Sequence, residues 1–112
     1  MQPELLRGHL DLLLLAIVQD GPLHGYAIVE ELRRRSDGTI DLPDGTVYPA
    51  LHRLEKAGLL VSEKSLVDGR PRRTYSITPS GKTAVTVKHR EFNTFARVIQ
   101  NIVGTPPWPI TN

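Results

Sequence analysis

The spacing of apolar residues along the chain predicts four helices. Residues 4–19 contain the run LLLLAIV, whose side chains would surround a helix on all sides, so this helix should be buried on more than one face. A chain of 112 residues has few ways to bury so many faces, which indicates a partner subunit. Residues 24–36 carry an apolar stripe opposite Glu and Arg residues four positions apart. Residues 45–57 and 79–103 show the same helical periodicity.

Two strand-like runs follow the third predicted helix, at residues 59–67 and 72–78. The segment between them begins with Asp-Gly at 68–69, a strong short-range signal for a hairpin turn. Residues 39–42 alternate between polar and apolar types and are predicted to form a brief strand. The order of these elements predicts a mainly α fold with a small β-hairpin, namely a winged helix-turn-helix followed by a C-terminal helix.

Pro49 lies inside the third predicted helix, where proline normally costs about 3 kcal/mol. A cap at Thr46 would place Pro49 at the third helical position, where no intrahelical hydrogen bond is lost. A cap at Asp44 would forfeit one bond to the Gly45 carbonyl and leave the first turn slightly irregular. Asp44 is favoured because aspartate is the stronger N-cap residue. Either cap makes this segment a stiff helix entrance and not a break in mid-helix.

The composition fits a single soluble globular domain, with 39% hydrophobic and 23% charged residues. The chain has no cysteine, which is compatible with a reducing cytoplasm. Its longest apolar run has seven residues, far fewer than the roughly 20 needed to cross a bilayer. We therefore expect a cytoplasmic protein, associated with the nucleoid if it binds DNA, and no membrane partner.

The net charge of +2 hides an asymmetry between the two parts of the chain. Residues 1–44 carry four Lys/Arg and eight Asp/Glu, whereas residues 45–112 carry ten Lys/Arg and four Asp/Glu. A basic second part makes nucleic acid a reasonable partner. On charge alone, a solvated surface is an equally good interpretation.

The helix-turn-helix order makes the third predicted helix the candidate for DNA recognition, because the start of that helix enters the major groove. The hydroxyl of Thr46 and the phenol of Tyr48 lie near the helix start and suit phosphate contacts. Arg53 is long enough to reach a guanine edge or a phosphate. Helical spacing turns four apolar residues inward, which are Val47, Ala50, Leu51 and Leu54.

The predicted hairpin carries a basic tip that can lie over a minor groove or the DNA backbone. Solubility and protection of a sheet edge by charge form the alternative interpretation. The basic residues of the hairpin are Lys64, Arg70, Arg72 and Arg73.

Other chemistry has little support in the sequence. The residues His9, His24, His52 and His89 lack metal-ligand spacing, and we expect no metal site. The serines lie in no nucleophile-elbow motif and the glycines form no phosphate-binding loop, so we expect neither an enzyme nor a cofactor. Glu55 is expected to form an ion pair with an arginine of the hairpin.

The last predicted helix contains a heptad-like seam formed by Phe92, Phe95, Ile99 and Ile102. The seam is short, so it predicts either a homodimer contact or packing on the rest of the same chain. The tail that follows contains the motif PPWP, and its prolines end the helix.

Four segments resemble the PadR family of bacterial transcriptional regulators: RGHLDLLLLAIV, HGYAIVEEL, GTVYPALHRLEKAGLL and GRPRRTYSITPSG. The similarity spans about residues 5–82 in matching order. The resemblance implies a winged helix-turn-helix with a C-terminal dimerisation helix. It also implies a repressor that releases DNA when a small molecule binds, often a phenolic or other aromatic compound.

The resemblance aligns Thr46, Tyr48 and Pro49 with the head of the family's recognition helix. It also assigns Tyr26 a hydrogen bond to a phosphate, with a half-buried ring and a hydrated hydroxyl as the alternative. Many relatives have a longer C-terminal region, so this chain looks like the short form and effector residues do not transfer. Trp108 is a weak candidate for a ligand site or a partner clamp, and a simple tail anchor is the more common role of such a residue.

These observations favour a homodimeric, sequence-specific DNA-binding regulator, which we expect to be a ligand-responsive repressor on a near-palindromic operator. The alternative is a winged-helix module that binds proteins and not DNA. The three predicted regions are the DNA-binding domain at 1–78, the dimerisation helix at 79–104 and the tail at 105–112. The predicted DNA contacts are Tyr26, Thr46, Tyr48, Pro49, His52, Arg53, Lys64, Arg70, Arg72 and Arg73. The predicted dimer contacts are Leu6, Leu10, Leu13, Phe92, Phe95, Ile99 and Ile102.

Overall fold

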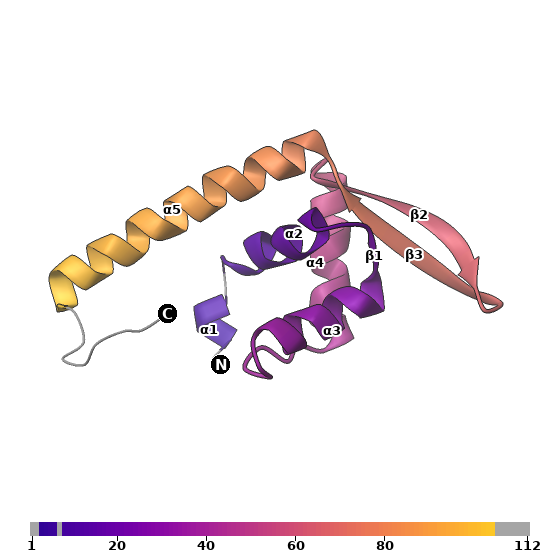
Figure 1. Cartoon of the computed structure of the whole chain (residues 1–112), viewed down its shortest axis with the longest axis horizontal. Coiled ribbons are helices and arrows are strands. Elements are labelled where there is room, and N and C mark those ends of the chain that lie inside the picture. Colours follow the sequence, from indigo (N-terminus) through magenta and orange to yellow (C-terminus); the bar gives the residue numbers. More distant parts are fainter. Residues whose placement is uncertain (1–2, 7, 105–112) are drawn as a thin grey trace.

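The structure, a computed structural model, describes residues 3–6 and 8–104 of the chain. Figure 1 shows a small helical body, a β-hairpin that projects from one side and a long last helix that extends from the other. The predicted fold class is confirmed, because helices dominate and a winged helix-turn-helix precedes the last helix. In chain order the elements are α1 (Pro3–Leu6), α2 (Leu10–Gln19), β1 (Leu23–His24), α3 (Gly25–Arg35), α4 (Asp44–Lys56), β2 (Leu60–Val67), β3 (Arg70–Ile77) and α5 (Pro79–Val103).

The predicted hairpin is present as β2 and β3, which pair antiparallel from Leu60 opposite Ile77 to Val67 opposite Arg70. Its turn consists of Asp68 and Gly69, both with positive φ, at 51° and 75°. Two consecutive residues of this kind match the right-handed twist of the strands, which explains the preference for Asp-Gly.

The third strand of the sheet was predicted in the wrong place. Residues 39–42, all of which the structure describes, form no strand. The strand is instead β1, whose residues Leu23 and His24 pair with Tyr75 and Thr74 of β3. The sheet order is β1-β3-β2, so β3 is the central strand. A two-residue strand has no alternation to detect, and it directly precedes a helix.

The first predicted helix is also wrong in part, because residues 4–19 form two helices and not one. Helix α1 ends at Leu6 and α2 begins at Leu10. Gly8 lies between them with a φ of 85°, a left-handed conformation that glycine adopts without a Cβ clash. The chain turns there, and His9 N donates to the Leu6 carbonyl at 2.9 Å.

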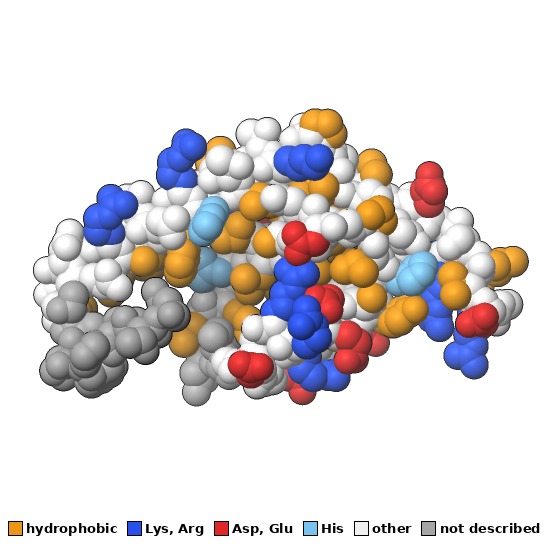
Figure 2. All heavy atoms as spheres, viewed as in Figure 1, with side chains coloured by type: hydrophobic (Ala, Val, Ile, Leu, Met, Phe, Trp, Pro, Cys, Tyr) orange, Lys and Arg blue, Asp and Glu red, His pale blue; other side chains and the backbone are white. Residues whose placement is uncertain are grey.

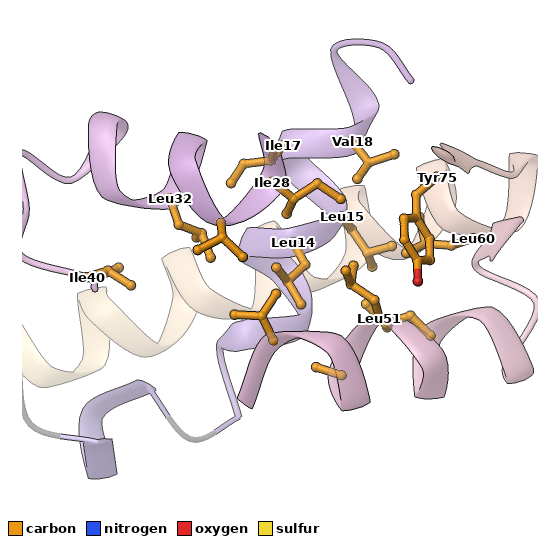
Figure 3. Close-up of a cluster of buried hydrophobic side chains, with 14 of the residues drawn as sticks. Leu14, Leu15, Ile17, Val18, Ile28, Leu32, Ile40, Leu51, Leu60 and Tyr75 are labelled. Atoms are coloured by element: carbon orange, nitrogen blue, oxygen red, sulfur yellow. The ribbon is translucent and has the colours of Figure 1, made fainter. Parts of the chain in front are cut away.

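The core lies where α2, α3 and α4 meet the base of the sheet, as Figure 3 shows. Helix α2 supplies the central layer, consistent with its apolar run. The largest fully buried side chains are Leu14, Leu15, Val18, Ile28, Val47, Leu51, Leu54 and Leu60. The four residues of α4 that were predicted to face inward are its four buried residues, so the orientation of this helix is confirmed.

Helix α4 begins at Asp44, one residue earlier than a cap at Asp44 would allow and three residues earlier than a cap at Thr46 would allow. Its N-cap is Pro43, in an extended conformation, and Thr46 N and Val47 N both donate to the Pro43 carbonyl, at 3.0 and 3.2 Å. Pro49 is therefore the sixth helical residue. It still forfeits the bond to the Gly45 carbonyl, and Gly45 is exposed, so water can reach that oxygen.

The three arginines at the end of α3 are all held by acidic side chains of their own chain. Arg33 pairs with Glu30 and Asp41, each at 3.1 Å. Glu31 accepts from Arg34 at 2.9 Å and from Arg35 at 2.8 Å. Figure 2 shows these basic and acidic side chains interleaved over α3. This helix therefore offers little unpaired positive charge to a partner.

The Glu31 carboxylate should make the stability of the protein pH-dependent in the acid range. Hydrogen bonds from Arg34 and then Arg35 lower the pKa of Glu31 from 4.5 to about 2. A lowered pKa stabilises the fold fully above pH 4.5, and that contribution is lost as the pH falls towards about 2. We expect the difference in unfolding free energy between wild type and Glu31→Gln to be present at neutral pH and to disappear as the pH falls through about 2. Urea unfolding of both proteins across this pH range measures the difference, with Glu63→Gln, at an exposed residue of the hairpin, as the control. A difference that stays constant with pH would contradict the prediction.

Candidate nucleic-acid interface

Helix α4 turns a polar face outward opposite its buried stripe. The predicted contact residues Thr46, Pro49, His52 and Arg53 are all exposed, and Tyr48 is 37% exposed. The start of the helix also carries Asp44 in its first turn. The outer face of the predicted recognition helix is therefore accessible from its beginning to its last turn.

Tyr48 is seated against Gly25, the first residue of α3. A Cβ atom at position 25 would lie 2.4 Å from Tyr48 Cε1, so the ring can occupy this place only beside glycine. Burial raises the pKa of Tyr48, the Asp44 carboxylate adds to this rise, and the Arg72 guanidinium opposes it. The phenol therefore keeps its proton at neutral pH and can donate a hydrogen bond to an anion.

Gly25→Ala should displace the Tyr48 ring and thereby lower the affinity for DNA. The added methyl must move the ring or separate α3 from α4, because 2.4 Å is far inside van der Waals contact. We expect DNA affinity to fall by about tenfold, the value of one lost contact of roughly 1.4 kcal/mol. Gly45→Ala is the matched control, since a Cβ there meets nothing within 4 Å. Equal affinities of the two variants in an anisotropy titration would contradict this role of Gly25.

A second cluster joins the start of α3 to the wing strand β3. The Arg72 guanidinium carbon lies 4.9 Å from the centroid of the Tyr26 ring, a cation–π contact. The His24 ring stacks on Tyr26 at 5.5 Å between centroids, and His24 Nδ1 forms a 2.9 Å hydrogen bond with Thr74 Oγ1. Because the Tyr48 ring lies against Gly25, the residue before Tyr26, this cluster adjoins α4 as well.

Arg73 and Glu55 are connected through a serine. Arg73 Nη1 donates to Ser62 Oγ at 2.8 Å, and Ser62 Oγ donates to Glu55 Oε2 at 2.7 Å. The expected ion pair between Glu55 and a hairpin arginine is therefore corrected to a relay through a hydroxyl. The relay fixes the base of the wing to α4. Beside it, a hollow of about 340 Å³ between α4 and the hairpin is lined by His52, Glu55, Lys56, Arg73 and Tyr75.

Arg53 forms an ion pair within its own chain, which the sequence did not predict. Its Nη2 donates to Asp11 Oδ1 in the first turn of α2, and its side chain remains 60% exposed. Any DNA contact of Arg53 would have to compete with this carboxylate. The other two basic candidates, Lys64 and Arg70, are exposed on the hairpin near its turn. Leu66, also near the turn, is 75% exposed.

The predicted dimer residues differ in how much of their surface is exposed. Phe95 and Ile99 are exposed on α5, and Ile102 is 79% exposed. Leu6 is 8% exposed and belongs to the core of its own chain, so it has little surface left for a partner. Leu10 and Leu13 are partly buried and pack against that core.

Phe92, which belongs to the same seam, touches its own domain. Its ring meets His9 edge-on, with 5.6 Å between the ring centroids. Phe92 also closes a groove of about 330 Å³ between α2 and α5, and Figure 2 shows histidine and hydrophobic side chains gathered where these two helices meet. The groove is lined by His9, Leu12, Leu13, Ala16, Val85, His89 and Phe92.

Two features are absent from the described residues, 3–6 and 8–104. These residues contain no group of three or more His, Asp or Glu side chains placed to hold a metal ion. They also contain no helix long and apolar enough to cross a membrane. Trp108, the weak ligand-site candidate, lies outside these residues.

Sequence reasoning identified the exposed residue types but missed the contacts between them. The seat of Tyr48 on Gly25 and the stacking of Arg72 on Tyr26 join residues that are far apart in the chain. Gly25 had one local signal, since it is the first residue of a predicted helix and glycine disfavours helices.

Comparisons with known proteins agree on one family. The sequence model of the "Transcriptional regulator PadR-like family" matches residues 14–87. A transcriptional regulator of Mycobacterium tuberculosis is 42% identical over 96 residues, which cover 86% of this chain and 87% of that protein.

Solved structures show the same similarity. A transcriptional regulator from Clostridium thermocellum superposes with a TM-score of 0.83 at 30% identity, over 89% of this chain and 98% of that one. A PadR family transcriptional regulator from Eggerthella lenta superposes with a TM-score of 0.80 at 31% identity, over 92% of this chain and 88% of that one.

Proposed function

Since the chain belongs to the PadR-like family of transcriptional regulators, we propose that it is a homodimeric, sequence-specific DNA-binding repressor that a small molecule releases from its operator. The observation that carries this proposal is the convergence of Tyr26, Tyr48 and Arg72 at one site. These residues come from α3, α4 and the wing, which are the parts of a winged helix-turn-helix that meet DNA. The proposal involves no enzymatic step, and it assigns the protein to the cytoplasm, at the nucleoid.

The distribution of free positive charge supports DNA as the partner. The arginines of α3 are neutralised by acids of the same chain. In the part of the winged domain that the structure describes, the Lys and Arg side chains near the proposed interface belong to α4 and the hairpin and not to α3. We propose that Arg72 and Tyr48 contact phosphates and that His52 faces base edges from the middle of α4. The hairpin cations that would add backbone contacts are Lys64, Arg70 and Arg73.

The exposed stripe of α5 supports a homodimer. Phe95, Ile99 and Ile102 are large apolar residues that remain exposed in a single chain, and Val98 and Val103 extend the stripe. Exposed apolar patches of this kind mark association surfaces. A two-fold dimer through α5 would set two recognition helices about 34 Å apart, one turn of DNA, on a near-palindromic operator.

The groove between α2 and α5 is the place we propose for a small aromatic effector. Its volume of about 330 Å³ lies within the range of small-molecule pockets, and its lining is mostly apolar with His9 and His89 as polar groups. It adjoins the proposed dimer seam at Phe92, so a ligand there would touch the element that spaces the two DNA-binding domains. Trp108 remains a weaker candidate for the same role.

Replacing Arg72 tests the proposed DNA interface through its salt dependence. Arg72→Ala should weaken binding to every DNA sequence and reduce the slope of log K against log salt by about one, the effect of one lost phosphate contact. Arg72→Lys keeps the charge and should keep most of the slope. The control is Arg34→Ala, which removes an arginine already paired with Glu31 and should leave the slope unchanged. A slope in Arg72→Ala equal to that of the wild type would exclude a phosphate contact at this residue.

A further inference from the structure

A single side chain, that of Thr78, joins the end of α4 to the beginning of α5. Its Oγ1 donates to the Gly58 carbonyl at 2.7 Å and accepts from Gly81 N at 3.0 Å. Its backbone N–H donates to the Leu59 carbonyl at 3.1 Å. Thr78 is thus the N-cap of α5 and a bridge to the segment that follows α4.

The segment that Thr78 holds is the C-terminal cap of α4. Gly58 has a φ of 79°, its N–H donates to the Glu55 carbonyl, and the Leu59 N–H donates to the Leu54 carbonyl, both at 3.0 Å. These two bonds form a Schellman motif, which ends the helix rigidly. An unbroken chain of hydrogen bonds therefore runs from the last turn of α4 to the first turn of α5.

Gly81 allows α5 to approach this cap at backbone distance. A Cβ at position 81 would lie 2.2 Å from the Leu59 carbonyl oxygen and 2.6 Å from Ile77 Cγ1. The first turn of α5 therefore rests on the α4–β2 connection with no side chain between them, at the point where these elements meet in Figure 1. This close contact leaves α5 little room to rotate about its first turn.

The direction of α5 has a large effect at its far end because the helix is long. Its 25 residues span about 37 Å, and the proposed dimer seam lies in the outer half. A tilt of about 10° at Pro79 would move the far end by about 6 Å, more than the rise of about 3.4 Å of one base pair. Val85 and Phe92 also pack towards α2, and these apolar contacts are non-directional, whereas the hydrogen bonds of Thr78 are directional.

From this geometry we infer that Thr78 is a positioning residue, which fixes the angle between α4 and α5 and thereby sets the separation of the two recognition helices in the dimer. The inference rests on the proposed function for its consequence at DNA. Its first step, the fixed angle between two helices of one chain, holds with or without DNA. Thr78 would select operators by the spacing of their half-sites without touching a base.

The absence of cysteine from the chain allows a direct measurement by site-specific spin labelling. Labels at Lys56→Cys and Arg90→Cys, in chains diluted with an excess of unlabelled chain, report the distance between α4 and α5. A label at Lys56→Cys alone, without dilution, reports the distance between the two recognition helices. Thr78→Val, which removes the hydroxyl and keeps the shape, should shift or broaden both distances by about 3 Å or more. Thr78→Ser should restore the wild-type distances. Thr83→Val is the control, because Thr83 Oγ1 bonds only within α5, to the Pro79 carbonyl.

Operator spacing provides the functional measurement. The wild type should prefer the natural spacing over one lengthened or shortened by one base pair by about tenfold, and Thr78→Val should reduce this preference to about twofold. Thr78→Ala, which removes the same hydroxyl, replaces Thr78→Val if the valine variant folds poorly.

The outcomes separate this inference from the proposed function. Wild-type distances and spacing preference in Thr78→Val would overturn the inference, even if the variant were less stable. If the single label gave no distance between subunits, or the wild type bound no DNA, the proposed function would fail. The two labels within one chain would then still decide whether Thr78 fixes the angle.

Discussion

Ile99→Glu is expected to convert the protein into a monomer and to abolish tight operator binding. Ile99 is 43% exposed on the seam of α5, and a dimer contact there would bury a carboxylate among apolar side chains. Light scattering should give the mass of one chain, 12.5 kDa. Loss of the second DNA-binding domain should lower operator affinity by about 10²- to 10⁴-fold, because binding at the second half-site is no longer intramolecular.

The control for this variant is Gln100→Glu. It places the same negative charge one residue further along α5, which projects about 100° away around the helix. This variant should remain a dimer and lose little affinity, so a general effect of added negative charge is separated from the effect on the seam. A dimeric Ile99→Glu protein with wild-type affinity would show that the dimer, if present, uses another surface.

Leu51→Ala is expected to have the largest effect on stability. Leu51 is fully buried in the core (Figure 3), and it belongs to α4, the helix that also presents the candidate DNA-binding face. Truncation of such a leucine leaves a cavity and costs about 2–5 kcal/mol of unfolding free energy. Lys56→Ala, on the exposed side of the same helix, should change it by less than about 0.5 kcal/mol.

Chemical denaturation of both variants should be compared at one fixed chain concentration, because the unfolding of a dimer depends on concentration. A loss below about 1 kcal/mol in Leu51→Ala would mean that α4 is not anchored through this side chain.

The sequence predicted correctly those elements that depend only on residues close together in the chain. The Asp68–Gly69 turn follows from two residues that accept positive φ, and the buried stripe of α4 follows from helical periodicity. The break at Gly8 was missed because apolar residues continue on both sides of it, so periodicity alone showed no interruption. The strand at Leu23–His24 was missed because it exists only through pairing with β3, about 50 residues later.

The candidate site was predictable as a set of exposed residues and not as an arrangement. The outward-facing side chains of α4 follow from the helical period of its own sequence, so the residues on its outer face were predicted correctly. The pairing of Arg53 with Asp11, 42 positions away, depends on how α2 packs on α4. The seat of Tyr48 on Gly25 and the bridge from Thr78 to Gly58 depend on packing in the same way.

We propose that this protein binds operator DNA through α4 and the wing, and a fluorescence anisotropy titration over a range of salt concentrations is the decisive experiment. The probes are DNA from upstream of its own gene and a scrambled duplex of equal length. We predict saturable binding with a preference for the upstream DNA of about 10³-fold or more. We also predict that log K falls linearly with log salt, with a slope of several phosphate contacts. Absence of binding even at low salt, or equal affinity for both duplexes, would contradict the claim and favour a winged-helix module that binds proteins.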